Sequence, residues 1–205
     1  MFETFTLDDI LPYAEIKGFV HIGGHVAEER EQYKQFPVIW FEAHPAYAAR
    51  LAENIAWEPY QTSYQALLSD VDDVEVDFYI TADEFASSMF KPAMHQDLFP
   101  HAGITEIIKL RTKRFDTLVK EEGLKPWLYN ILVLDVQGAE LQVLKGMGEY
   151  LTNFPVVICE YTVVELYEDN PRLDDLDEFL SSDYKRVHPT DTHLLVGDAM
   201  YVRRA

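Results

Sequence analysis

Acidic residues stand directly after three apolar, strand-like runs of this sequence. Glu42 follows VIWF, Asp135 follows ILVL and Glu160 follows VVIC. In a largely parallel sheet the carboxyl ends of the strands share one edge, and ligands bind in the crevice beyond that edge. We therefore expect the three carboxylates to converge on one crevice, where their charge suits a cationic ligand.

A glycine turn follows the first strand-like run, in the segment GFVHIGGH at 18–25. Gly23 and Gly24 let the chain turn sharply and let a ligand approach the backbone, and the helix after them presents free N–H groups to that ligand. Glu42 lies 19 residues after Gly23, a spacing at which an acid can accept hydrogen bonds from both hydroxyl groups of a ribose. These features predict a cofactor that contains adenosine, and they allow both NAD and S-adenosylmethionine.

Features elsewhere in the chain help to choose between the possible nucleotide cofactors. No lysine follows Gly23 and Gly24 as it would in a phosphate-binding loop, which disfavours a nucleotide triphosphatase. The C-terminal part does not form a second mononucleotide-binding half, and we expect it to end in a hairpin that turns at Val196–Asp198. This order favours a methyltransferase sheet, and an NAD-linked oxidoreductase is the lesser alternative.

Strand-like and helix-like segments alternate over most of the chain, which predicts an α/β fold with a largely parallel sheet and helices on both faces. We expect residues 1–17 to form an N-terminal helical arm and residues 18–205 to form a single domain. A long irregular segment is expected at 82–104. The expected strands are 18–25, 38–45, 63–69, 74–80, 107–115, 129–136, 155–162 and 184–189, and the expected helices are 27–36, 46–57, 115–123, 139–147 and 173–180.

The composition disfavours several classes of protein. A net charge of −19 over 205 residues repels phosphate backbones, so we expect no nucleic-acid partner. Cys159 is the only cysteine, which excludes an intrachain disulfide and a cysteine-rich zinc site, and no histidine spacing is typical of a metal site. The sequence shows neither a signal-peptide pattern nor an apolar run of about 18 residues, so we expect a cytoplasmic protein outside the membrane.

Several motifs together resemble one known family. LDVQGAELQVLKG at 134–146 resembles the signature of the FkbM-type S-adenosylmethionine-dependent methyltransferases. HIGGHVAEE at 21–29 resembles the first motif of that family, and WFEAHP at 40–45 resembles the second. Weaker matches follow in the same order, so that the resemblance covers about 18–203, at 66–70, 87–89, 114–118, 156–160 and 197–203.

The resemblance implies a Rossmann-like methyltransferase fold, with a mostly parallel seven-stranded sheet, helices on both faces and a C-terminal antiparallel hairpin. It implies S-adenosylmethionine as the cofactor and a hydroxyl group on a sugar or another small molecule as the methyl acceptor. The sequence leaves a homo-oligomer open. The expected cofactor-binding residues are His21, Gly23, Gly24, His25, Glu42, Ala43, Ser69 and Asp135.

A base near the acceptor hydroxyl would take its proton during methyl transfer. Asp135 and Glu160 are the first candidates for this base, and His25 and His95 are the next. Departures from the family pattern support an alternative, a non-catalytic nucleoside-binding or interaction module that retains the fold. They are His21 in place of an acid, Gln137 in place of glutamate, and Ala27 in place of a glycine, where a methyl group could narrow the approach to the cofactor.

Overall fold

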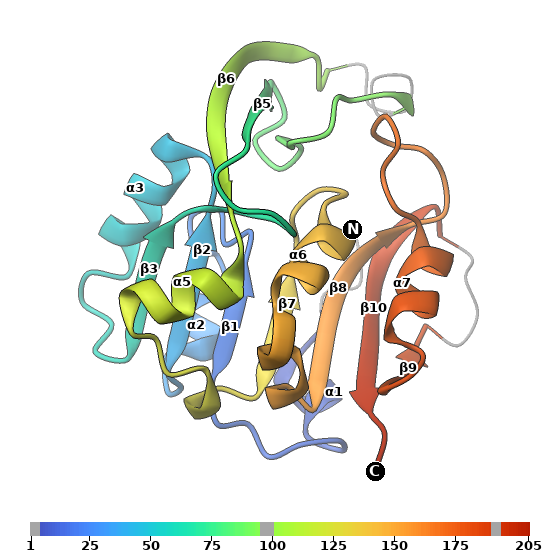
Figure 1. Ribbon diagram of the computed structural model, residues 1–205. Helices are drawn as coiled ribbons and strands as arrows, with labels where there is room; N and C mark the ends of the chain where they lie inside the picture. The colour runs from blue at the N-terminus through green and yellow to red at the C-terminus, as the bar shows by residue number, and fades with distance from the viewer. Residues whose placement is uncertain (1–4, 95–100, 190–193) are drawn as a thin grey trace.

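A seven-stranded sheet forms the centre of the protein in the computed structural model, which describes residues 5–94, 101–189 and 194–205 (Figure 1). The strand order is β3-β2-β1-β7-β8-β10-β9. Neighbouring strands pair in parallel except β10, which is antiparallel to both β8 and β9. This confirms the predicted sheet and its C-terminal hairpin. The strands are β1 Phe19–Ile22, β2 Val38–Glu42, β3 Gln61–Gln65, β7 Ile131–Leu134, β8 Val156–Thr162, β9 Tyr184–His188 and β10 Val196–Arg203.

The chain reverses its direction of travel across the sheet between β1 and β7. It passes from β1 through β2 to the β3 edge, and it later returns to pair β7 with the other side of β1. The loops after β1 and β7 therefore leave the sheet in opposite directions. In open α/β sheets such a switch point opens the crevice in which ligands bind.

Helices cover both faces of the sheet, and each face has its own apolar core. Successive strand residues point to opposite faces, so Phe19 packs in one core and Val20 in the other. Figure 1 shows α5, α6 and α7 in front of the sheet. These helices are α5 Phe115–Glu122, α6 Glu140–Gly146 and α7 Leu173–Leu180, and those on the other face are α1 Leu7–Ile10, α2 Arg30–Tyr33 and α3 Pro45–Asn54. Two 3₁₀ turns complete the elements, at Pro126–Leu128 and Gly148–Asn153.

A second, three-stranded sheet stands above the carboxyl edge of the first (Figure 1). It contains β4 Leu67–Leu68, β5 Glu75–Thr81 and β6 Ile104–Lys113 in the order β4-β6-β5. The predicted strand at 63–69 is thus divided between two sheets, because β3 pairs with β2 and β4 pairs with β6. As a result the small sheet faces the crevice at the switch point.

The C-terminal turn is not where the sequence suggests. Val196–Asp198 lies inside β10, because Gly197 and Asp198 pair with Tyr161 and Glu160 of β8. The prediction of a turn there is therefore wrong, although the hairpin itself exists between β9 and β10. Gly-Asp is common in turns, but pairing with a long neighbouring strand decides the conformation here.

The N-terminal segment packs against the face that carries α2 and α3. Ile10 and Ile16 are buried in the core of that face. Asn130 fixes the entry to β1, since its Oδ1 accepts from the Lys17 amide at 2.8 Å and its Nδ2 donates to the Glu15 carbonyl oxygen at 2.7 Å. The domain division at residue 17 stays a prediction. Within the described part of the chain, no helix has the length and apolar character needed to cross a membrane.

Candidate active site

The turn after β1 packs directly against the end of β7. Gly23 has a left-handed backbone with φ of 85°, and a Cβ there would lie 1.7 Å from the Asp135 carbonyl oxygen. Gly24 is also enclosed, because a Cβ would lie 2.8 Å from the Trp40 ring. Both glycine N–H groups donate to the Phe41 carbonyl oxygen, at 2.8 and 2.9 Å. The two glycines therefore allow the turn to pack closely between β2 and β7. The sequence pattern predicts instead that they make room for a ligand.

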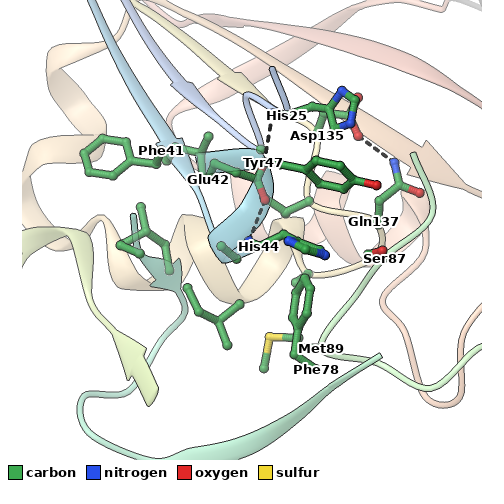
Figure 2. A pocket seen from close by; sticks show the side chains of 18 of the residues that line it. His25, Phe41, Glu42, His44, Tyr47, Phe78, Ser87, Met89, Asp135 and Gln137 are labelled. Atoms are coloured by element: carbon green, nitrogen blue, oxygen red, sulfur yellow. Dashed lines mark hydrogen bonds between the residues drawn. The ribbon is translucent and has the colours of Figure 1, made fainter. Parts of the chain in front are cut away.

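Glu42, at the end of β2, connects this turn to the start of α3. Its Oε2 accepts a hydrogen bond from the His25 backbone N–H at 2.9 Å, and its Oε1 accepts one from the His44 N–H at 2.6 Å (Figure 2). Burial raises the pKa of Glu42 to about 7, although both hydrogen bonds act in the opposite direction. Each carboxylate oxygen has a second lone pair, so the side chain can also accept hydrogen bonds from the two hydroxyl groups of a ribose.

One amide joins the two acids that follow β7 and end β8. Gln137 Nε2 donates to Asp135 Oδ1 at 2.6 Å and to Glu160 Oε2 at 3.0 Å. Burial raises the pKa of both acids, and the neighbouring Asp135 raises that of Glu160 further. The hydrogen bond from Gln137 acts on the pKa of Asp135 in the opposite direction, and His21 does so to a smaller extent. Of the two acids, Glu160 therefore takes up a proton more readily than Asp135.

Glu140 closes the turn between β7 and α6. Its Oε1 accepts from the N–H groups of Val136 and Gly138, at 3.0 and 3.3 Å. Burial raises the pKa of Glu140 to about 7. The side chain is therefore occupied in shaping the turn that carries Gln137.

A pocket of ≈ 670 Å³, including the open space at its mouth, lies at this edge of the large sheet. Its walls come from the ends of β1, β2 and β7, from β4 and β5 of the small sheet, and from residues between 84 and 89 (Figure 2). Among the described residues that line it there are three acids, Glu42, Glu84 and Asp135, and neither lysine nor arginine.

Five of the predicted cofactor-binding residues line this pocket and are brought together by the fold: Gly23, His25, Glu42, Ala43 and Asp135. Of the predicted catalytic residues, Asp135 and His25 line it, and Glu160 is connected to it through Gln137. His95 lies outside the described residues. The roles of all these residues remain predictions.

Three predicted cofactor-binding residues lie outside the pocket lining. His21 stacks on Trp40 with 4.7 Å between ring centroids, and burial lowers its pKa to about 4. Gly24 lies against the same tryptophan ring. The hydroxyl group of Ser69 donates to Asp70 Oδ1 at 3.2 Å. None of these three residues is part of the pocket lining.

Several pocket residues carry no clear signal in the sequence. The ring centroid of Tyr47 lies 4.3 Å from those of both His25 and His44 (Figure 2). The ring centroid of Phe85 lies 4.8 Å from that of His25. Helical periodicity places Tyr47 among ordinary residues of α3, and Phe85 belongs to a segment without periodicity. His44 is part of the WFEAHP motif, which could have identified it.

Ala27 does not narrow the pocket. Its backbone is left-handed with φ of 60°, a conformation that favours glycine. The methyl group is fully buried in the apolar core on the α2 and α3 face, and Ala27 is not among the lining residues. This substitution therefore leaves the entrance to the pocket unchanged.

The fold and the pocket define a nucleoside-binding α/β domain of the methyltransferase class. The strand order, the switch-point crevice and the acid at the end of β2 all belong to that class. A profile of the methyltransferase FkbM domain matches residues 19–187. The chain belongs to the FkbM methyltransferase family.

Known proteins similar to this chain include the 2-O-methyltransferase NoeI of Sinorhizobium fredii, which is 29% identical over 135 residues. The aligned part is 62% of this chain and 54% of that protein, so the chain spans about half the length of this relative. A solved protein assigned as an O-methyltransferase in Klebsiella pneumoniae has 9% identity and a TM-score of 0.52, over 99% of this chain and 83% of the other. This likeness shows a shared fold. Magnesium protoporphyrin IX methyltransferase of Synechocystis PCC 6803, solved with bound S-adenosylmethionine, has 10% identity and a TM-score of 0.47, over 91% and 69% of the two chains.

The pocket residues fit S-adenosylmethionine, the cofactor of this family. Glu42 offers the paired acceptors that a ribose needs, and Asp135 offers a negative charge near a sulfonium or ammonium group. The Nε2 atom of His25 is buried and has no hydrogen-bond partner in the described part of the chain, while its Nδ1 bonds to Glu28 at 2.6 Å. A ligand could use that free ring atom.

Proposed function

We propose that this protein transfers a methyl group from S-adenosylmethionine to a hydroxyl group of a sugar or another small molecule. The main support is the pocket at the switch point, where Glu42 and Asp135 face one cavity from two different strand ends. The likeness to the 2-O-methyltransferase NoeI supports an oxygen acceptor. The bound cofactor supplies a methyl group that is already activated, so the protein's task is to position the acceptor and receive its proton.

Asp135 is the proposed base. Its carboxylate lies at the pocket wall, and Gln137 Nε2 holds one of its oxygens at 2.6 Å, which leaves the other available to an acceptor hydroxyl. Burial raises the pKa of Asp135, which brings the carboxylate closer to the range in which a base works well near neutral pH. His25 is the second candidate, because its Nε2 atom accepts or donates no hydrogen bond among the described residues and the side chain lines the same cavity.

The segment at 84–89 is proposed to cover the acceptor. Ser87 and Met89 line the pocket from this segment, and Phe85 adds an aromatic ring beside His25. Apolar side chains exclude water from the reacting groups, and the Ser87 hydroxyl offers a donor and an acceptor to a polyhydroxylated molecule.

The experiment that tests this proposal measures binding and turnover separately. The purified protein is titrated with S-adenosylmethionine in a calorimeter and then incubated with a panel of sugars and small alcohols, whose gain of one methylene is followed by mass spectrometry. We expect binding, a methylated product from at least one class of acceptor, and loss of that product with Asp135→Asn. Binding without transfer to any acceptor would support the non-catalytic module instead, and an absence of binding would contradict both.

A further inference from the structure

The side chain of Gln137 has hydrogen-bond partners at both ends. Its Nε2 donates to Asp135 and Glu160, and its Oε1 accepts from the Tyr167 hydroxyl at 2.9 Å. An amide can donate two hydrogen bonds through its nitrogen and accept through its oxygen. These three contacts therefore use both N–H groups and fix the orientation of the amide.

The backbone of Gln137 also contacts the segment that covers the pocket. Its carbonyl oxygen accepts from Ser88 Oγ at 2.7 Å. The Tyr167 hydroxyl, whose one proton can go to the amide oxygen, also lies 3.3 Å from the Ala86 carbonyl oxygen. Ser88 in turn pairs with Tyr79 of β5 through two backbone hydrogen bonds of 2.8 and 3.1 Å. Gln137 thus connects the turn after β7 with the small sheet and with the loop after β8.

Gln137 adopts this position in an unfavourable backbone conformation. Its φ is 55°, in the left-handed region where glycine is favoured, and it is followed by Gly138 with φ of 95°. Such conformations persist only where the surrounding structure holds them, and they cluster at functional sites. A glycine at position 137 would suit the backbone better, so the contacts of the side chain must offset the cost of this conformation.

We infer that Gln137 is a positioning residue for methyl transfer, which holds the Asp135 and Glu160 carboxyl groups in one arrangement and connects them to the covering segment at 84–89. This inference rests on the proposed function. The neutral amide separates two acids that would otherwise face one another directly. It also orients the Asp135 carboxylate toward the pocket, where an acceptor proton would be received.

The surroundings of the two acids explain why an amide is suited to this position. Asp135 is exposed toward the pocket and Glu160 is half-buried, and no lysine or arginine among the described residues bonds to either side chain. The family signature has glutamate at position 137, but in this chain a charged carboxylate there would add repulsion, whereas the amide donates to both acids. The titratable groups that face this pair from the surrounding elements are His21 on β1, His25 and Glu29 after it, Glu140 on α6, Asp198 on β10 and Tyr167 after β8.

The test uses two substitutions with different effects. Gln137→Gly removes every side-chain contact but suits the left-handed backbone. Gln137→Glu keeps the size of the side chain and the acceptor for Tyr167, but a carboxylate cannot donate to Asp135 or Glu160. Asp73→Gly is the matched control, because Asp73 has φ of 58°, is exposed and does not line the pocket.

Both Gln137 variants are expected to lower kcat by about 100-fold, as misplacement of a reacting group does, with less than about a threefold change in the KM of the acceptor. Because the amide lowers the pKa of Asp135, its loss should move the acid limb of the kcat–pH profile up by about one pH unit. Asp73→Gly should leave kcat and the profile unchanged. Wild-type kcat and an unchanged pH profile in Gln137→Glu would overturn the inference, as would loss of folding in both Gln137 variants, which would show a purely structural role.

A second readout separates this inference from the proposed function. Calorimetric binding of S-adenosylmethionine is measured from pH 5 to pH 8 in the same proteins. If the wild type binds but methylates nothing, the proposed function fails. Even in that case, the binding data still test the positioning of Asp135. If binding is lost on acidification at a higher pH in Gln137→Glu than in the wild type, the positioning role is supported. Identical binding profiles would reject this role.

Discussion

The Glu42 carboxylate and the His25 backbone N–H are joined by a hydrogen bond of 2.9 Å, although 17 residues separate them in the chain. This bond ties the end of β2 to the turn after β1, which are the two halves of the proposed cofactor site. Loss of Glu42 therefore removes a ligand for the ribose and also releases the turn.

Glu42→Ala is expected to weaken S-adenosylmethionine binding at least tenfold. Hydrogen bonds to a charged group are worth about 1.5–3 kcal/mol each, and about 1.4 kcal/mol corresponds to a factor of ten in affinity. Because burial raises the pKa of Glu42 to about 7, the affinity of the wild type should fall as the pH decreases below about 7. Calorimetry should show that the affinity of Glu42→Gln depends less on pH than that of the wild type. Glu75→Gln, which alters an exposed acid of the small sheet, should have the affinity and pH dependence of the wild type.

Gly23→Ala is expected to prevent stable folding. A methyl group would meet the Asp135 carbonyl oxygen at 1.7 Å on a backbone with φ of 85°, and neither backbone can yield without breaking the pairing of β1 with β7. Gly103→Ala is the control, because nothing lies within 4 Å of its added methyl group. Thermal unfolding should show a loss of more than about 3 kcal/mol for the first variant and little change for the second. A Gly23→Ala protein with the wild-type melting temperature would contradict this packing.

The sequence predicts the acid positions well because simple geometry determines them. A buried parallel strand ends where its apolar run ends, and parallel strands share their carboxyl edge. Glu42 and Asp135 therefore meet at one pocket as the pattern indicates. The family motifs extend over the same segments, which makes the order of the strands predictable as well.

The sequence suggests that the loop around Ser87 and Ser88 covers the acceptor, but the path of this segment could not be predicted. Residues 82–94 have no periodicity, and their path is determined by contacts with distant segments, such as the Ala93 N–H donating to the Leu166 carbonyl oxygen at 2.8 Å. The contacts of Gln137 could not be predicted for the same reason, because Glu160 lies 23 residues further along the chain. The prediction of a turn at Val196–Asp198 is wrong because pairing with β8 overrides the local turn propensity of these residues.

Glu160→Gln is expected to retain most of its methyl-transfer activity, within about tenfold of the wild type, whereas Asp135→Asn should lose at least about 100-fold. Burial and the neighbouring Asp135 raise the pKa of Glu160 well above its usual range, which favours the protonated acid, and the neutral amide resembles that form. Steady-state kinetics with any acceptor found in the panel would check this. Equal losses in the two variants would show that Glu160 is the charged base instead.

Asp198→Asn is expected to stabilise the protein without ligand at pH 8. Burial, with help from Asp135 and Glu29, raises the pKa of Asp198 from 3.8 to about 7. The native state then binds a proton more readily than the unfolded state, so the free energy of unfolding falls as the pH rises from about 4 to about 7. Asparagine removes this loss, and each 1 kcal/mol gained should raise the melting temperature by about 2–4 °C.

The control for that measurement is Glu53→Gln, which alters an exposed acid on α3. Its melting temperature should follow the wild type at every pH. The advantage of Asp198→Asn should shrink as the pH is lowered toward 4, where the aspartate is protonated as well. An advantage that stays constant from pH 8 to pH 4 would mean that packing, rather than charge, causes it.

The charge of the pocket should select against anionic acceptors. Glu84 lines the mouth, about half exposed, with its Oε2 3.9 Å from both His25 Nε2 and Arg50 NH1. We expect kcat/KM for a neutral hydroxyl acceptor to exceed that for its phosphate ester by at least about tenfold, since like charges near a surface repel by a few kcal/mol at most and solvent screens part of this. Glu84→Lys should reduce the ratio, and added salt should reduce it in the wild type. A ratio that neither change alters would show that shape, and not charge, excludes the ester.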